Sequence, residues 1–144
     1  MVNPDQPIYI DEHLYLGNFS SATYDALQKN KITSVVCLTK DKHDYPPEIK
    51  LFHIDDISED LSPESFALKK LESAVDFIEQ QIDAGENVLV HCMAGACRSP
   101  TVIIAYIIKK RELTVTEACN YVKQRASYIN PTYMDLLDQY YYSL

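Results

Sequence analysis

The feature that most constrains this chain is an apolar run, Val88 to Val90, that leads directly into His91 and Cys92. Such a run is typical of a strand buried on both faces of a parallel sheet. Five residues separate Cys92 from Arg98, and Ser99-Pro100 then indicates the N-cap and first position of a helix. The segment therefore places a thiol and a guanidinium at a turn from strand to helix.

This arrangement suits the binding of a phosphate dianion against a thiolate. Inward-facing backbone N–H groups, a helix N-terminus and an arginine all stabilise an anion. A thiol is a strong nucleophile only when ionised, and its ordinary pKa is about 8.5. The groups that would favour an ionised Cys92 would also bind the non-bridging oxygens of a phosphate.

Other interpretations of the same residues are weaker. A cysteine after a buried strand is most often a small core residue, but Gly95 and Arg98 beside it favour a site. Zinc held by His91, Cys92 and Cys97 would lack a second short-spaced ligand pair. A nucleotide-binding P-loop needs closely spaced glycines, whereas this chain has only Gly17, Gly85 and Gly95. We therefore expect no metal and no cofactor.

The hydrophobic periodicity predicts strands that alternate with helices. Strands are expected at residues 8–10, 14–16, 33–38, 51–55 and 87–91. Helices are expected from Ser20 or Ser21 to about residue 29, from Ser62-Pro63-Glu64 to Gly85, at residues 101–110, from Thr116 to about residue 126, and from Asn130-Pro131 onward. This order predicts an α/β fold with a central, mostly parallel, twisted sheet of about five strands and helices on both faces.

Ligands of such sheets bind beyond the carboxyl ends of the strands. Cys92, Asp55 and the stretch from Lys40 to His43 all fall at those ends. Lys40, Lys42 and His43 could contact acidic or phosphorylated flanks of a substrate. Cys37 and Cys119 lie on apolar faces and are expected to be inert core residues.

Size and charge restrict the classes of function. A chain of 144 residues predicts a single domain, residues 1–144. Its net charge of −8 disfavours general binding of nucleic acid or of anionic membranes. Four cysteines without a disulfide-like spacing, and no visible secretory signal, predict a cytoplasmic location that can extend to the nucleus. We also expect a monomer.

The motif His91-Cys92-x-Ala94-Gly95-x-x-Arg98-Ser99 resembles the signature of the cysteine-dependent protein tyrosine phosphatases, and most closely that of their dual-specificity branch. Residues 14–18, 32–39 and 129–137 are similar to other segments of that family, in the same order. Two residues depart from the branch: Cys97, where serine or another small residue is usual, and Cys37, where asparagine is common.

The resemblance implies a two-step reaction. Cys92 would attack phosphorus and form a cysteinyl-phosphate, while Arg98 would bind two equatorial oxygens. Phosphate would be bound by the loop residues Met93, Ala94, Gly95, Ala96, Cys97 and Arg98. Ser99 would hydrogen-bond the sulfur, and His91 would either lower the thiol pKa from the strand side or be purely structural.

A carboxylic acid must protonate the leaving group. Alignment of Leu61 with the family's leucine makes Asp55 the general acid, and Asp56 is the alternative one residue away. A separate likeness concerns Cys97, since low-molecular-weight tyrosine phosphatases have a comparable cysteine before the arginine. We therefore hypothesise a reversible disulfide between Cys97 and Cys92 that protects the nucleophile from overoxidation.

The function predicted is a dual-specificity protein phosphatase acting on phosphotyrosine and phosphoserine/phosphothreonine, with phosphorylated proteins as partners. The alternatives are a phosphoinositide or RNA 5′-phosphate phosphatase with the same loop, or a non-catalytic phosphate-binding module. The loop positions Met93, Ala94, Ala96 and Cys97 are uncharged, which argues against a polyanionic headgroup. The retained Cys92 and Arg98 argue against the non-catalytic module.

Overall fold

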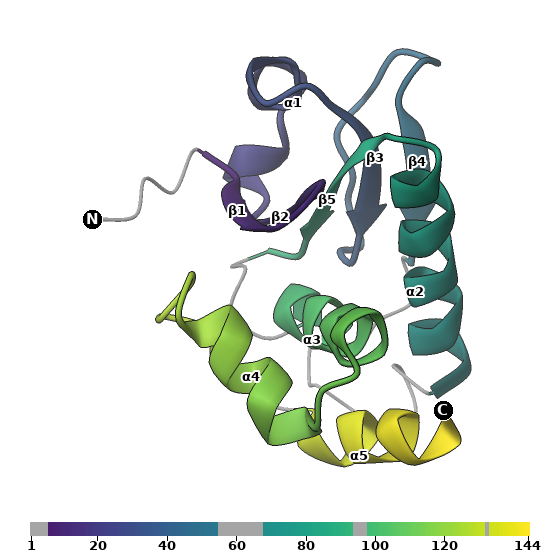
Figure 1. Cartoon of the computed structure of the whole chain (residues 1–144). Helices are drawn as coiled ribbons and strands as arrows, with labels where there is room; N and C mark the ends of the chain where they lie inside the picture. The colour runs from purple at the N-terminus through teal and green to yellow at the C-terminus, as the bar shows by residue number, and fades with distance from the viewer. Residues whose placement is uncertain (1–5, 55–67, 94–97, 132) are drawn as a thin grey trace.

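A five-stranded sheet of order β1-β2-β5-β3-β4 forms the centre of the structure, a computed structural model that describes residues 6–54, 68–93, 98–131 and 133–144 (Figure 1). The strands are β1 (Ile8–Asp11), β2 (Leu14–Gly17), β3 (Ile32–Cys37), β4 (Lys50–His53) and β5 (Asn87–His91). β1 is antiparallel to β2, and the three other pairings are parallel. The expected α/β fold with a mostly parallel sheet is confirmed.

β5 occupies the middle of the sheet because its side chains are apolar on both faces. Val88, Leu89 and Val90 are completely buried. Parallel neighbours on both sides, β2 and β3, satisfy its backbone polar groups. His91 is in register with Gly17 of β2 and Cys37 of β3, so three strands end side by side at one edge.

Helices cover both faces of the sheet. On one face lie a 3₁₀ turn (Ser20–Ala22) and α1 (Tyr24–Lys29), which share a core cluster with β3 and β5. On the other face lie α2 (Leu68–Asp83), α3 (Arg98–Arg111), α4 (Val115–Lys123) and α5 (Met134–Ser143). α3 contacts α2, α4 and α5 as well as the sheet, which is why its residues 98–108 are all buried. Among the described helices, none is long and apolar enough to span a bilayer.

Two predicted N-caps are wrong by a few residues. Residues 20–22 form a 3₁₀ turn, and α1 begins only at Tyr24, because the Thr23 hydroxyl accepts the Ala26 N–H at 3.3 Å. α4 begins after Thr114 rather than Thr116, because Thr114 and Glu117 form a reciprocal capping box. In both cases the N-cap is a threonine close to the predicted residue, and its hydroxyl accepts a backbone N–H of the first helical turn.

Of the other predicted helix boundaries, the end of α2 is confirmed and the start of the last helix is wrong. Gly85 follows α2 with a φ of +85°, a conformation that glycine adopts without strain, so the predicted end is confirmed. The predicted start at Ser62-Pro63-Glu64 lies outside the described residues. The last helix begins at Met134, not at Asn130-Pro131, since residues 129–131 form an irregular segment whose Ile129 is buried in the core.

A buried carboxylate connects the start of the sheet to the α3–α4 layer. Asp11 accepts hydrogen bonds from Arg111 at 2.6 and 3.2 Å and from the Tyr121 hydroxyl at 3.0 Å. Burial raises the pKa of Asp11, but the hydrogen bonds from Arg111, Glu12 and Tyr121 and the charge of Arg111 bring it below its ordinary 3.8 overall. The folded state therefore favours the ionised form of Asp11.

We expect Asp11→Asn to lower the free energy of unfolding at pH 7 by about 1–3 kcal/mol, because a charge-assisted network loses its acceptor. A carboxyl whose pKa is depressed on folding stabilises above its unfolded pKa, and this contribution disappears as pH falls through the folded value. Urea unfolding from pH 7 downward should show the difference shrinking as the pH approaches and passes below 3.8. The adjacent, exposed Glu12→Gln is the control, with an expected change within about 0.5 kcal/mol; a pH-independent cost of Asp11→Asn would contradict the assignment.

Candidate active site

Cys92 lies directly after the central strand, at the carboxyl edge of the sheet. Cys92 is only 4% exposed, and the adjacent His91 is fully buried. The carbonyl of His91 accepts the Leu38 N–H at 2.9 Å, which extends the β3–β5 pairing to the last residue before Cys92. The position of the thiol is therefore fixed by strand pairing on the side from which the chain arrives.

The start of α3 brings two predicted site residues to this thiol. Arg98 is the first described residue of α3 and is buried, and Ser99 is fully buried. The Ser99 hydroxyl lies 3.2 Å from the Cys92 sulfur. The sequence predicts Ser99 as the N-cap, but it lies within the helix, and its hydroxyl is directed to the sulfur.

The structure describes only part of the predicted site. It brings together His91, Cys92, Arg98 and Ser99, with Met93 immediately after the nucleophile. Asp55, Asp56 and the loop residues Ala94, Gly95, Ala96 and Cys97 lie outside the described residues, so the general acid and the proposed redox pair stay predictions from sequence.

The buried imidazole of His91 is uncharged at neutral pH. Burial lowers the pKa of His91 to about 4, an effect only partly opposed by its hydrogen bond to the Cys92 carbonyl. Nδ1 donates to that carbonyl at 3.4 Å. A neutral ring orients the backbone beside Cys92 but supplies no positive charge to stabilise a thiolate, which favours the structural alternative for His91.

His43 does not extend toward solvent as the sequence suggests. Its side chain is half-buried, its Nε2 donates to the Phe19 carbonyl at 2.7 Å, and its ring stacks on the Phe19 ring. Lys40 and Lys42 beside it are exposed. Of the three residues expected to contact substrate flanks, only the two lysines remain available for that role.

The two cysteines expected to be inert lie in the core. Cys37 is fully buried and Cys119 is 7% exposed. Burial raises the pKa of both thiols. Neither thiol is favoured as a thiolate at neutral pH.

Comparison with known proteins identifies the family. The family model described as dual specificity phosphatase, catalytic domain, matches residues 14–143. The chain belongs to this family. The predicted enzyme class, a protein-tyrosine/dual-specificity phosphatase, is thereby confirmed.

Relatives of this phosphatase occur in a virus and in animals. It is 33% identical over 126 residues to the putative tyrosine phosphatase 123R of Invertebrate iridescent virus 6, covering 88% of this chain and 84% of the viral protein. It is also 33% identical over 137 residues to human dual specificity protein phosphatase 5, covering 88% of this chain. That match spans only 33% of the human protein, about a third of its length.

Solved structures share the same fold. The human tyrosine phosphatase-like serine/threonine/tyrosine-interacting protein superposes with a TM-score of 0.86 at 28% identity, covering 94% of this chain and 95% of that one. PTPMT1 in complex with PI(5)P gives a TM-score of 0.82 at 19% identity, covering 95% of each chain. At that identity the second likeness shows the fold alone.

Two large side chains of the phosphatase are exposed: Met93, which the sequence places in the loop after Cys92, and Tyr128, which it does not single out. Met93 is 52% exposed and Tyr128, between α4 and α5, is 41% exposed. Burial, and secondarily the negative charge of Cys92, raise the pKa of the Tyr128 phenol. An aromatic residue in a polar loop is a weak sequence signal, and its electrostatic interaction with Cys92, 36 residues away in the sequence, arises only from tertiary folding.

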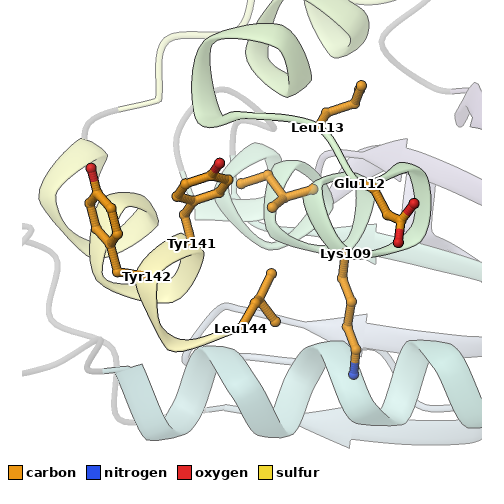
Figure 2. Close-up of a pocket in the computed structure, with 7 residues that line it drawn as sticks. Lys109, Glu112, Leu113, Tyr141, Tyr142 and Leu144 are labelled. Atoms are coloured by element: carbon orange, nitrogen blue, oxygen red, sulfur yellow. The ribbon is translucent and has the colours of Figure 1, made fainter.

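A pocket of about 590 Å³ lies away from this site, at the other end of α3 (Figure 2). It is lined by Ile108, Lys109, Glu112, Leu113, Tyr141, Tyr142 and Leu144. Lys109 lies ten positions after Ser99 on this helix, a distance of about 15 Å along the axis. This pocket is therefore no part of the phosphate-binding site.

We expect Ser99→Ala to slow the second chemical step of the phosphatase more than the first. The hydroxyl, 3.2 Å from sulfur, can donate to the departing thiolate when the cysteinyl-phosphate is hydrolysed. Loss of a hydrogen bond to a charged group costs about 1.5–3 kcal/mol, which corresponds to a decrease of roughly 10- to 100-fold in kcat. Rapid-quench kinetics should show a burst of leaving group with kcat/KM largely retained; an equal loss in kcat and kcat/KM without a burst would contradict this role.

Proposed function

We propose that this phosphatase hydrolyses phosphotyrosine and phosphoserine/phosphothreonine in proteins through a cysteinyl-phosphate. The proposal rests chiefly on one observation: the Cys92 sulfur lies at the carboxyl edge of the sheet, 3.2 Å from the Ser99 hydroxyl and beside the N-terminal turn of α3. The positive end of a helix, with Arg98 in its first turn, suits an anion at the sulfur.

In the proposed reaction, which has two chemical steps, each site residue has a definite role. The Cys92 thiolate attacks phosphorus, the P–O bond to the substrate breaks, and Asp55 gives its proton to the departing oxygen. Water then attacks the cysteinyl-phosphate, Asp55 takes a proton from that water, and the S–P bond breaks to release phosphate and thiolate. Arg98 and the backbone N–H groups of residues 93–98 stabilise the equatorial oxygens in both transition states.

Phosphorylated proteins suit this chain better than polyanionic small molecules. The net charge is −8, and the loop residues between Cys92 and Arg98 are uncharged. Met93, which directly follows Cys92, and Tyr128 present an exposed thioether and an exposed aromatic ring, surfaces that contact a peptide or a phosphotyrosine ring without requiring charge. We therefore place phosphoinositides and RNA 5′-phosphates second, as alternative substrates.

The purified chain should hydrolyse phosphotyrosine and phosphothreonine peptides, and Cys92→Ser should lose this activity entirely. Phosphate release is measured in parallel on both peptides, on phosphoinositide-containing vesicles and on a 5′-phosphorylated RNA. Faster turnover of either of the last two than of both peptides would replace the protein-phosphatase assignment. Release by Cys92→Ser at the wild-type rate would contradict the cysteinyl-phosphate mechanism.

Asp55→Asn should lower kcat by about 10²–10⁴-fold on an alkyl phosphate, because general acid catalysis contributes a factor of that order. The effect should be much smaller on a substrate such as p-nitrophenyl phosphate, whose leaving group needs little protonation. The loss of the acid should also remove one limb of the bell-shaped pH profile of kcat/KM. Asp56→Asn is the matched control; if it shows these effects and Asp55→Asn does not, Asp56 is the acid.

A further inference from the structure

One backbone hydrogen bond connects the first residue of the phosphate-binding loop to a distant part of the chain. The Phe19 N–H donates to the Met93 carbonyl at 3.1 Å, and Met93 directly follows Cys92. Phe19 comes just after β2, whose last residue, Gly17, is in register with His91. The position of Phe19 therefore bears directly on where the loop leaves the nucleophile.

Phe19 is held in place by a turn within its own segment and by a hydrogen bond from the β3–β4 connection. On its own segment, Asn18 and Ser21 form a closed turn, in which the Asn18 side chain accepts the Ser21 N–H at 2.8 Å and the Ser21 hydroxyl accepts the Asn18 N–H at 2.9 Å. From the β3–β4 connection, His43 Nε2 donates to the Phe19 carbonyl at 2.7 Å. The same carbonyl accepts the Ala22 N–H at 3.2 Å, so both of its lone pairs are used.

The side chain of His43 makes two separable contacts with Phe19. A carbonyl oxygen only accepts, so Nε2 carries the proton in this hydrogen bond. The two rings also stack, with centroids 4.0 Å apart and an interplanar angle of 23°. The Phe19 ring in turn meets the buried His91 ring edge-on at 6.2 Å. His43 thus contacts the segment that supports the site through both the backbone and an aromatic ring.

The surrounding loop turns inward at only a few positions. Lys42 and Asp44, on either side of His43, are exposed, whereas His43 and Tyr45 are half-buried. The Tyr45 hydroxyl donates to the Ala22 carbonyl. His43 and Tyr45 therefore both donate to carbonyls of residues 19–22 and tie this loop to the segment that contains Phe19.

We propose that His43 is a positioning residue of the phosphatase. Its Nε2–H fixes the Phe19 carbonyl, and the Phe19 N–H then fixes the Met93 carbonyl, so that the backbone entering the phosphate-binding loop is aligned for the anion. This inference rests on the proposed role of residues 93–98 in binding phosphate. It assigns a function to a residue 49 positions before Cys92 in the sequence.

Three substitutions separate the hydrogen bond from the ring stack. His43→Gln keeps an N–H donor and loses the ring, His43→Phe keeps a ring and loses the donor, and His43→Ala loses both. Affinity for inorganic phosphate, measured by titration calorimetry, is the main readout because it does not require turnover. We expect phosphate affinity and kcat/KM to fall about tenfold in His43→Ala and His43→Phe, the ratio expected for one hydrogen bond, and His43→Gln to recover most of this loss.

His53→Ala is the matched control for a purely structural effect. His53 is a half-buried histidine whose Nε2 donates to the Thr39 carbonyl at 2.7 Å, the same type of bond as in His43, but made to a different segment. It should lower the melting temperature without changing phosphate affinity. The inference is overturned if His43→Ala binds phosphate like the wild type, if His43→Phe is the variant that recovers affinity, or if His53→Ala loses as much affinity as His43→Ala.

The same experiment distinguishes this inference from the proposed function. A wild-type chain that neither binds inorganic phosphate nor hydrolyses p-nitrophenyl phosphate would remove the proposed function itself. A wild-type chain that does both, with His43 variants unchanged, would leave that function in place and reject only the positioning role.

Discussion

The parallel pairing of β5 with β2 on one side and β3 on the other is the constraint on which the site depends. Because this pairing continues to His91, whose carbonyl accepts the Leu38 N–H, the chain reaches Cys92 along a fixed direction. α3 then packs against β5 and β2 on one face of the sheet. Its burial against three other helices fixes the position of Ser99 relative to the Cys92 sulfur. A change in either pairing would move the Cys92 sulfur relative to Arg98 and Ser99, the groups at the start of α3.

The neighbouring imidazole is neutral, so we expect the electrostatic contribution to this site to come from the helix and Arg98. Burial lowers the pKa of His91 to about 4, so the ring is neutral over the pH range in which such an enzyme operates. A neutral ring can still hold the Cys92 carbonyl through Nδ1 and pack against Phe19. We infer that His91 maintains the shape of the strand end, and that the first turn of α3 supplies the positive potential.

The strand–helix order and the location of the nucleophile can be predicted from sequence because each depends on local patterns. The apolar run before His91 predicts a doubly buried strand, and β5 has the expected bounds, Asn87–His91. The starts of α1 and α4 are harder to predict because several residues able to cap lie within a few positions, and the choice of Thr23 and Thr114 depends on backbone geometry. The inward position of His43 has no sequence signal, because its partner, Phe19, is 24 residues away and no periodicity connects the two.

A comparison of Cys37 with Cys92 shows which surroundings turn a buried thiol into a candidate nucleophile. Both sulfurs lie 3.2 Å from a hydroxyl, that of Thr39 for Cys37 and that of Ser99 for Cys92. A thiol–hydroxyl pair is therefore not sufficient, since burial still raises the pKa of Cys37 despite its hydroxyl and backbone partners. The two cysteines differ in the segment to which their strands lead: β3 leads to an irregular connection, whereas β5 leads to the N-terminal turn of a buried helix that carries Arg98. Catalytic potential in this chain thus depends on the element that the cysteine precedes, and only secondarily on its nearest polar neighbour.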